Sequence, residues 1–225
     1  METNISTLAL FLSRIRPDEK VIYRGHPSSS YNLLPSVARR WQSNKDDLVR
    51  MEKSALARFK QQAVPFIKYR PDHDLEWLVL MQHHGTPTRL LDWTFNPVVA
   101  LYFAVCSKFN EDGIVYQTTY IKQKELSEVK DVFQSKKIFV YTPRHITERI
   151  GPQSGCFIVY AEPLIEIPSD HRRITRYKIP KRYKGLIRSE LSKIGIHEGI
   201  LFPGLDGLCK SLKVYIDQEI VNSMW

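Results

Sequence analysis

The sequence predicts a single α+β domain with a helix-rich first half and a strand-rich second half. Apolar residues recur at helical spacing before residue 113, whereas short β-rich runs separated by turns follow it. The chain has 225 residues, of which 43% are hydrophobic and 25% charged, as in ordinary globular domains. We see neither an internal repeat nor a disordered linker, so we expect one domain over 1–225 with a core at about 15–215.

The first half is expected to begin with a strand at 21–24 and a helix capped by Asn44. A second helix ends near His84, and the segment 86–96 shows no periodicity and is expected to be a loop. The helix over 98–109 is apolar on nearly every face. A helix of that kind is expected to be central and buried.

The second half is expected to supply most of the strands of one mixed or antiparallel sheet. Its predicted elements are strands at 114–121, 137–141, 156–161 and 174–179, a helix at 182–194 ended by Gly195, a short strand or loop at 196–202, and a helix at 205–215.

Composition and missing motifs exclude several classes of protein. The three cysteines are widely spaced and odd in number, which argues against a disulfide framework and for a reducing compartment, so we expect a cytoplasmic protein. The first 20 residues lack the features of a secretory signal, and no apolar run is long enough for a membrane span. Zinc, P-loop, dinucleotide-binding and nucleophile-elbow motifs are missing, so no metal is expected.

The chain is basic, with 33 Lys and Arg against 24 Asp and Glu and a formal charge of +9. Such an excess favours polyanionic partners such as RNA or DNA. The densest basic region spans 172–188 and contains Arg172, Arg173, Arg176, Lys178, Lys181, Arg182, Lys184 and Arg188. It is either a nucleic-acid surface or a solvated face of a strand and a helix.

Two stretches carry unusual polar groups. Arg24 ends an apolar strand and is followed by Gly25, which suits a phosphate or carboxylate contact or a structural ion pair. The segment 82–97 places many hydrogen-bonding side chains between two apolar helices. Buried polar groups must be paired or face a cleft. We expect Asp92 to be a buried structural carboxylate that pairs with Arg89, with the following helix start, or with both.

These stretches resemble the FRG domain family, named for its Phe/Tyr-Arg-Gly motif. The matching residues are Tyr23-Arg24-Gly25, the block Gln82-His83-His84-Gly85-Thr86-Pro87-Thr88-Arg89-Leu90-Leu91-Asp92-Trp93-Thr94, Asn96-Pro97, the run at 153–157 and that at 195–207. The resemblance covers about 15–215. It implies a bacterial or phage protein near toxin–antitoxin or phage-defence systems, with an antitoxin or chaperone as a possible partner.

A weaker resemblance to ADP-ribosyltransferases of the Arg–Ser–Glu class implies a mechanism and a related fold, in which NAD is a substrate. It assigns catalytic roles to Arg24 and Glu198, to which we add His83. It assigns NAD binding to Arg24, Thr86 and Thr88. We add Gly25 and Arg89 as further candidates for NAD binding, and Tyr23 and Trp93 as rings that could stack on nicotinamide. The sequence departs from that class because Thr86-Pro87-Thr88 replaces Ser-Thr-Ser and Glu198 has no Glu-x-Glu partner.

The leading hypothesis is therefore an enzyme that transfers ADP-ribose from NAD to a macromolecule, with RNA or DNA as the candidate acceptor. Two alternatives remain open. One is a non-catalytic module that binds nucleic acid or protein, with Arg24, Arg89 and Asp92 in a core polar network. The other is a nuclease that uses His83, His84 and Asp92. The transferase hypothesis expects Arg24, His83, Thr88 and Glu198 to line one cleft.

Overall fold

The computed structural model describes residues 2–15, 20–39, 41–119, 122–144, 149–167 and 173–222. Its strands are β1 (Glu2–Asn4), β2 (Val21–His26), β3 (Leu90–Thr94), β4 (Gly113–Thr119), β5 (Phe139–Tyr141), β6 (Gly155–Val159) and β7 (Ile174–Ile179). Its α-helices are α1 (Leu8–Arg14), α2 (Lys45–Ala63), α3 (Asp74–His83), α4 (Pro97–Val105), α5 (Ile150–Gln153), α6 (Lys181–Lys193), α7 (Glu198–Leu201) and α8 (Leu205–Asn222).

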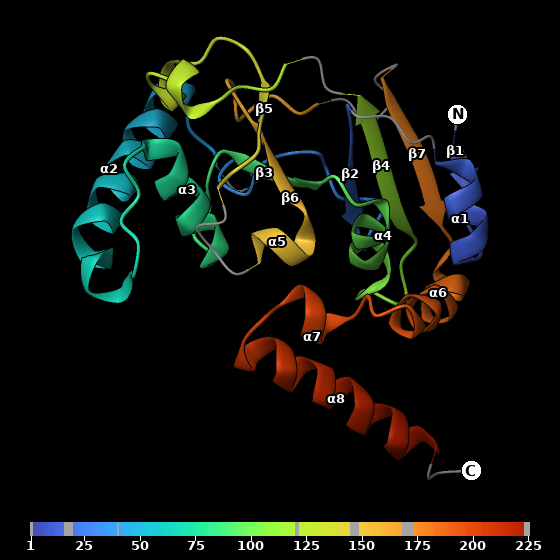
Figure 1. Cartoon of the computed structure of the whole chain (residues 1–225). Coiled ribbons are helices and arrows are strands. Elements are labelled where there is room, and N and C mark those ends of the chain that lie inside the picture. Colours follow the sequence, from blue (N-terminus) through green and yellow to red (C-terminus); the bar gives the residue numbers. More distant parts are fainter. Residues whose placement is uncertain are drawn as a thin grey trace.

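The strands form one mixed sheet in the order β1-β7-β4-β2-β3-β6-β5 (Figure 1). Only the β1–β7 pair is parallel among the described strands. The α+β class and the mixed sheet predicted from the sequence are confirmed.

Helix α4 packs on one face of the sheet, against β2 and β4. Six of its nine residues are buried, which confirms the expectation of a central apolar helix. The helix ends at Val105 rather than at Phe109. It stops there because Lys108 adopts a left-handed conformation with φ 53°, and the buried ammonium of Lys184 holds the carbonyls of Ser107 and Lys108.

Two further expectations were wrong. The segment 86–96 contains strand β3, which was missed because the strand is only five residues long and lies in a segment with Pro87 and many polar residues. The segment 196–202 contains the short helix α7 instead of a strand, since His197 begins a helical turn before Phe202. Strand β1 and helix α1 were not predicted, and α8 runs on to Asn222.

Apolar clusters cover both faces of the sheet. On one face, α4 and α6 enclose a cluster with Tyr23 and Val115, and α3 covers a second cluster with Leu90 and Phe157. On the other face, Ile22 packs with residues of β3 and β6 and with the segment that follows β2. Residues from successive positions on β2 and β3 therefore face opposite sides of the sheet.

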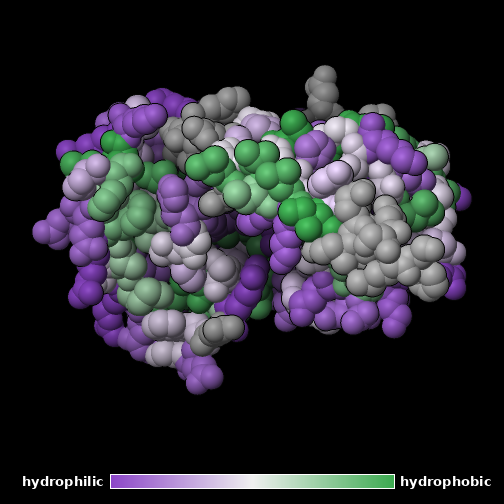
Figure 2. Space-filling model, turned by 90° about the horizontal axis from the view of Figure 1, so that it is seen from below, coloured by the Kyte–Doolittle hydropathy of each residue, from purple (hydrophilic) through white to green (hydrophobic). Residues whose placement is uncertain are grey.

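Helix α8 lies apart from the sheet and packs mainly against α7 (Figure 1). Figure 2 looks onto this side of the molecule and shows apolar side chains gathered on it. Among the side chains of α8 whose exposure the structure describes, the exposed large apolar residues are Leu205, Leu208, Leu212, Tyr215 and Ile216. No helix in the described part of the chain has the length and apolar content that crossing a bilayer requires.

Candidate ligand pocket

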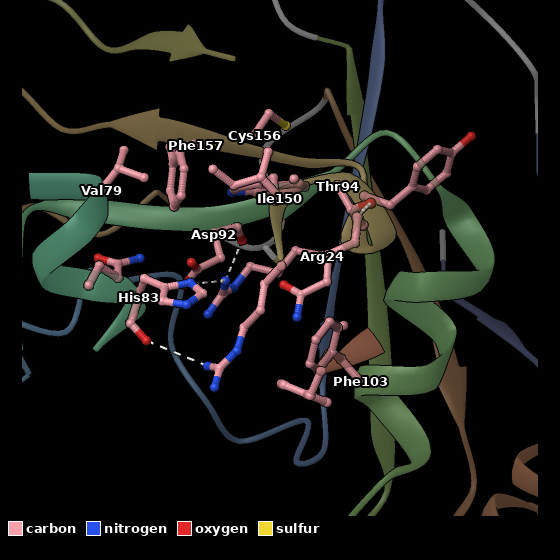
Figure 3. A pocket seen from close by; sticks show the side chains of 17 residues that line it. Arg24, Val79, His83, Asp92, Thr94, Phe103, Ile150, Cys156 and Phe157 are labelled. Carbon is pink, nitrogen blue, oxygen red and sulfur yellow. Dashed lines mark hydrogen bonds and ion pairs between the residues drawn. The ribbon is translucent and has the colours of Figure 1, made fainter. Parts of the chain in front are cut away.

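A pocket of about 290 Å³ opens between the ends of β2, β3 and α3 (Figure 3). Strand β2 is in register with β3 at a single pair, Tyr23 with Thr94, so the two strands separate beyond it. The pocket lies at this separation. Its lining residues are Tyr23, Arg24, Gly25, Val79, Gln82, His83, Asp92, Trp93, Thr94, Phe103, Arg149, Ile150, Gln153, Gly155, Cys156, Phe157 and Phe202.

The backbone of Gly25 allows α4 to lie directly on β2. A Cβ at Gly25 would lie 1.8 Å from the carbonyl oxygen of Ala100, and one at Gly113 would lie 2.2 Å from that of Ala104. No real side chain tolerates such distances to backbone atoms. The glycine that follows Arg24 therefore sets the position of the strand that carries this arginine.

Arg24 is the central cation of the pocket. Its side chain is 12% exposed, and its Nη1 donates to the backbone oxygen of Asp92 and lies 3.8 Å from Oδ2 of the same residue. Its Nε donates to Nε2 of His26 at 2.7 Å. Burial lowers the pKa of Arg24, and the Asp92 carboxylate opposes that shift. A guanidinium carries five N–H groups, so these bonds leave donors for a ligand.

Asp92 faces the pocket as an exposed carboxylate, which corrects the expectation of a buried residue. Its side chain is 64% exposed, and Figure 3 shows it beside Arg24. The start of α4 is capped by Asn96 instead, whose Oδ1 accepts from the backbone N–H of Val98 at 3.1 Å. Asp92 is exposed because it lies on the strand face opposite to its buried neighbours Leu91 and Trp93.

Arg89 is separate from this pocket. It is 0% exposed and forms a two-pronged ion pair with Glu52 of α2, in which its Nε donates at 3.0 Å. The expected pairing of Arg89 with Asp92 was wrong, because positions three apart at a strand lie on opposite faces. The core network proposed for Arg24, Arg89 and Asp92 is therefore not formed as a unit.

His83 contributes a neutral imidazole to the pocket. Partial burial and the charge of Arg149 lower the pKa of His83 to about 4, so the ring is neutral near pH 7. The backbone oxygen of His83 accepts from Nη1 of Arg149 at 3.5 Å, as drawn in Figure 3. His84 is exposed and does not line the pocket.

Arg149 and Gln153 are pocket residues that the sequence analysis missed. The guanidinium of Arg149 lies 5.3 Å from the ring centroid of Phe202. The side chain of Gln153 donates to the backbone oxygen of Leu201 at 2.9 Å. Gln153 falls in the run at 153–157 that was compared with the FRG pattern in the sequence, but no role in the site was expected for it. We find no comparable sequence signal for Arg149.

The aromatic walls of the pocket differ in accessibility. Tyr23 and Trp93 are 4% and 3% exposed and are held in the core, whereas Phe103 and Phe202 are half-buried. Phe103 and Phe202 are therefore better placed than Tyr23 or Trp93 to present a ring to a ligand. Their centroids lie 6.1 Å apart in an edge-to-face arrangement.

Thr86 and Thr88 do not line the pocket. Thr88 is 1% exposed; its hydroxyl donates to the side chain of Gln82 and accepts from the backbone N–H of Leu90 at 3.1 Å. These bonds hold the entry to β3. Thr86 is half-buried, and its backbone N–H donates to the carbonyl of Met81 at 3.0 Å.

Glu198 lies in a second cavity, of about 520 Å³, which α6, α7 and α8 border. Its carboxylate accepts from Nη2 of Arg188 at 2.5 Å. The expectation that Glu198 and Thr88 share a cleft with Arg24 and His83 is not met. The structure brings together Arg24, His83 and Asp92.

Much of the basic region is neutralised within the fold. Arg172 lies outside the described residues. Arg176 pairs with Glu2, Lys178 with Asp112 at 3.1 Å, and Arg188 with Glu198, while Lys184 is buried. Lys181 and Arg182 are exposed at the start of α6.

Comparison with protein families supports the resemblance described above. The FRG domain model matches residues 19–113. This FRG segment contains β2, β3, α3 and α4, and therefore Arg24, His83 and Asp92. Arg149, Gln153, Phe202 and Glu198 lie beyond it. No curated protein and no solved structure matches the chain.

Proposed function

We propose that the pocket beside Arg24 binds NAD and that the protein transfers ADP-ribose from it to a macromolecule. One observation carries this proposal: the FRG segment places a partly buried guanidinium, an exposed carboxylate and a neutral imidazole around one cavity with aromatic walls. An arginine binds phosphate, an aromatic ring stacks on nicotinamide, and a carboxylate stabilises positive charge on ribose.

The size of the cavity suits one half of the dinucleotide. About 290 Å³ is at the lower end of the range for ligand pockets. We assign the nicotinamide, its ribose and the nearer phosphate to the cavity, with the phosphate on Arg24 and the ring against the aromatic wall formed by Phe103 and Phe202. The adenosine half would extend beyond the cavity.

In the proposed reaction the bond between nicotinamide N1 and ribose C1′ breaks. The electron pair of that bond leaves with nicotinamide, which becomes neutral, and an oxocarbenium-like charge develops on the ribose. A nucleophile of the acceptor then bonds to C1′ and loses a proton. We assign the electrostatic role to Asp92 and proton acceptance to His83, whose lowered pKa leaves it neutral.

Asp92 replaces Glu198 in this assignment because Asp92 lines the pocket and Glu198 does not. The nature of the acceptor is a second part of the proposal. The net charge of +9 and the exposed Lys181 and Arg182 favour a nucleic acid over an acidic protein. A role as a toxin or defence effector rests on the family resemblance alone.

Calorimetric titration with NAD tests the binding step. We expect wild-type protein to bind NAD and Arg24→Ala to bind it at least tenfold more weakly, because a charge-assisted phosphate contact is lost. Arg182→Ala is a matched control, since it removes an exposed arginine outside the pocket. Equal binding by all three proteins, or no binding by the wild type, would overturn the proposal.

The nuclease alternative assigns catalysis to His83, His84 and Asp92. Two of these residues, His83 and Asp92, line the pocket. His84, which that alternative requires, is outside the pocket. Incubation with labelled nucleic acid, with and without NAD, distinguishes strand cleavage from transfer of ADP-ribose.

A further inference from the structure

His26 holds the guanidinium of Arg24 from the side opposite to Asp92. The two residues are two positions apart on β2, so their side chains lie on the same face of the strand. Nε2 of His26 accepts from Nε of Arg24 at 2.7 Å, and Nδ1 lies 3.2 Å from the backbone oxygen of Tyr31. His26 is 3% exposed and does not line the pocket.

The two hydrogen-bond partners of His26 determine its tautomer. The backbone oxygen of Tyr31 can only accept, so Nδ1 must carry the proton. The guanidinium of Arg24 can only donate, so Nε2 must present its lone pair. The ring must therefore be neutral. Its environment agrees, because burial and the charge of Arg24 lower the pKa of His26 to about 2.

The ring of His26 is fixed in place by two aromatic neighbours. Tyr31 and Tyr116 contact it edge to face, with centroid distances of 6.0 and 5.4 Å. Because the fixed ring of His26 accepts from Nε of Arg24, the Nη groups of the arginine are directed toward Asp92 and the cavity. Without it, the arginine side chain would sample several rotamers, and binding would have to order it.

We propose that His26 is a positioning residue that prepares Arg24 to bind the phosphate of the ligand. This inference rests on the proposed function for its ligand, but its structural part can be tested separately. The functional test is NAD affinity, and the structural test is the NMR signal of the Arg24 Nε–H, which a hydrogen bond to His26 protects from exchange with solvent.

Two variants separate positioning from packing. His26→Phe keeps a ring against Tyr31 and Tyr116 but removes the acceptor, whereas His26→Gln restores an uncharged acceptor near the position of Nε2. We expect His26→Phe to weaken NAD binding roughly tenfold, since hydrogen bonds to charged groups have that effect. We expect His26→Gln to recover much of that loss, and both variants must first show cooperative unfolding.

A double-mutant cycle with Arg24→Ala decides whether His26 acts through the arginine. We expect His26→Phe to have no further effect on NAD affinity once Arg24 is removed. An equal effect in both backgrounds, or full affinity in His26→Phe alone, would overturn the inference. So would rapid solvent exchange of the Arg24 Nε–H in wild type. A third outcome separates the two proposals. If the Arg24 Nε–H is protected in wild type and loses that protection in His26→Phe, the positioning of Arg24 is supported. If the wild type in the same experiments does not bind NAD, the proposed function is refuted.

Discussion

Gly25 lies so close to Ala100 that a Cβ on the glycine would be 1.8 Å from the carbonyl oxygen of the helix residue. This contact joins β2, which carries Arg24, to the buried helix α4. Gly25, which follows Arg24, therefore has a packing role. It allows a strand and a helix to meet backbone to backbone beside the pocket.

Replacing Gly25 by Ala should lower the free energy of unfolding by about 3 kcal/mol or more, because the added methyl meets backbone atoms that cannot move aside. Urea unfolding measures this change. Gly185→Ala is the matched control: it lies inside α6, and a Cβ there meets nothing within 4 Å. We expect the control to gain about 0.5–1 kcal/mol from helix propensity. Equal effects at the two glycines would refute this account.

Removing one partner of the Arg89–Glu52 ion pair should greatly lower the free energy of unfolding. Both side chains are almost completely buried, so Arg89→Met leaves an unpaired carboxylate in the core and should cost about 3–5 kcal/mol. The double variant Arg89→Met, Glu52→Leu removes both charges and should be more stable than the single variant. If urea unfolding shows the double variant to be less stable than Arg89→Met, then the unpaired carboxylate of Glu52 does not cause the destabilisation of the single variant.

Lys184 should stabilise the end of α4. Its Nζ carries three N–H donors and lies within hydrogen-bonding distance of the backbone oxygens of Pro27, Ser107, Lys108 and Glu111, and the residue is 0% exposed. Lys184→Met would leave these carbonyls without that donor, at a cost of about 1–3 kcal/mol or more. Lys181→Met, at an exposed position of the same helix, should change stability by less than about 0.5 kcal/mol. Thermal unfolding of both variants checks the difference.

Stability should fall as the pH drops below 6.5. The pKa of His26 is about 2 in the folded protein and 6.5 in a free histidine, so below pH 6.5 the unfolded chain binds a proton that the folded chain refuses. The loss from His26 should reach about 2 kcal/mol at pH 5. The pocket residue His83, with a pKa of about 4, acts in the same direction.

Urea unfolding of His26→Gln at pH 7.5, 6 and 5 isolates that contribution. The variant should lose less stability than the wild type over this range, because Gln does not titrate. Parallel pH curves for the two proteins would show that His26 is not buried in the neutral form.

The sequence predicted well those features that depend on local pattern and poorly those that depend on pairing across the fold. The all-round hydrophobicity of α4 and the cap at Asn44 indicated the helices directly. The partner of Arg89 is Glu52, 37 positions away on another helix, and no local signal identifies it. Asp92 was read as buried because its neighbours are apolar, although a strand turns alternate residues to opposite faces.

The candidate site shows the same division. Arg24 and His83 were found from polar character at element ends, and both line the pocket. Glu198 was chosen from the order of residues in a transferase family, and order along the chain does not fix which cavity a residue enters. Arg149, at the start of α5, reaches the pocket because it lies beside His83 at the end of α3, and this juxtaposition requires the folded sheet.

The most direct test of the proposed reaction is the release of nicotinamide from NAD by wild type, Asp92→Asn and Glu198→Gln. Both substitutions remove one carboxylate charge; Asp92 lines the pocket beside Arg24, whereas Glu198 lies in the second cavity. We expect Asp92→Asn to fold normally, because the Asp92 side chain is 64% exposed. The variant should still bind NAD, but its kcat for nicotinamide release should be at least tenfold lower than that of wild type. We expect Glu198→Gln to release nicotinamide at the wild-type rate. Loss of turnover in Glu198→Gln with full activity in Asp92→Asn would contradict the assignment of the reaction to this pocket.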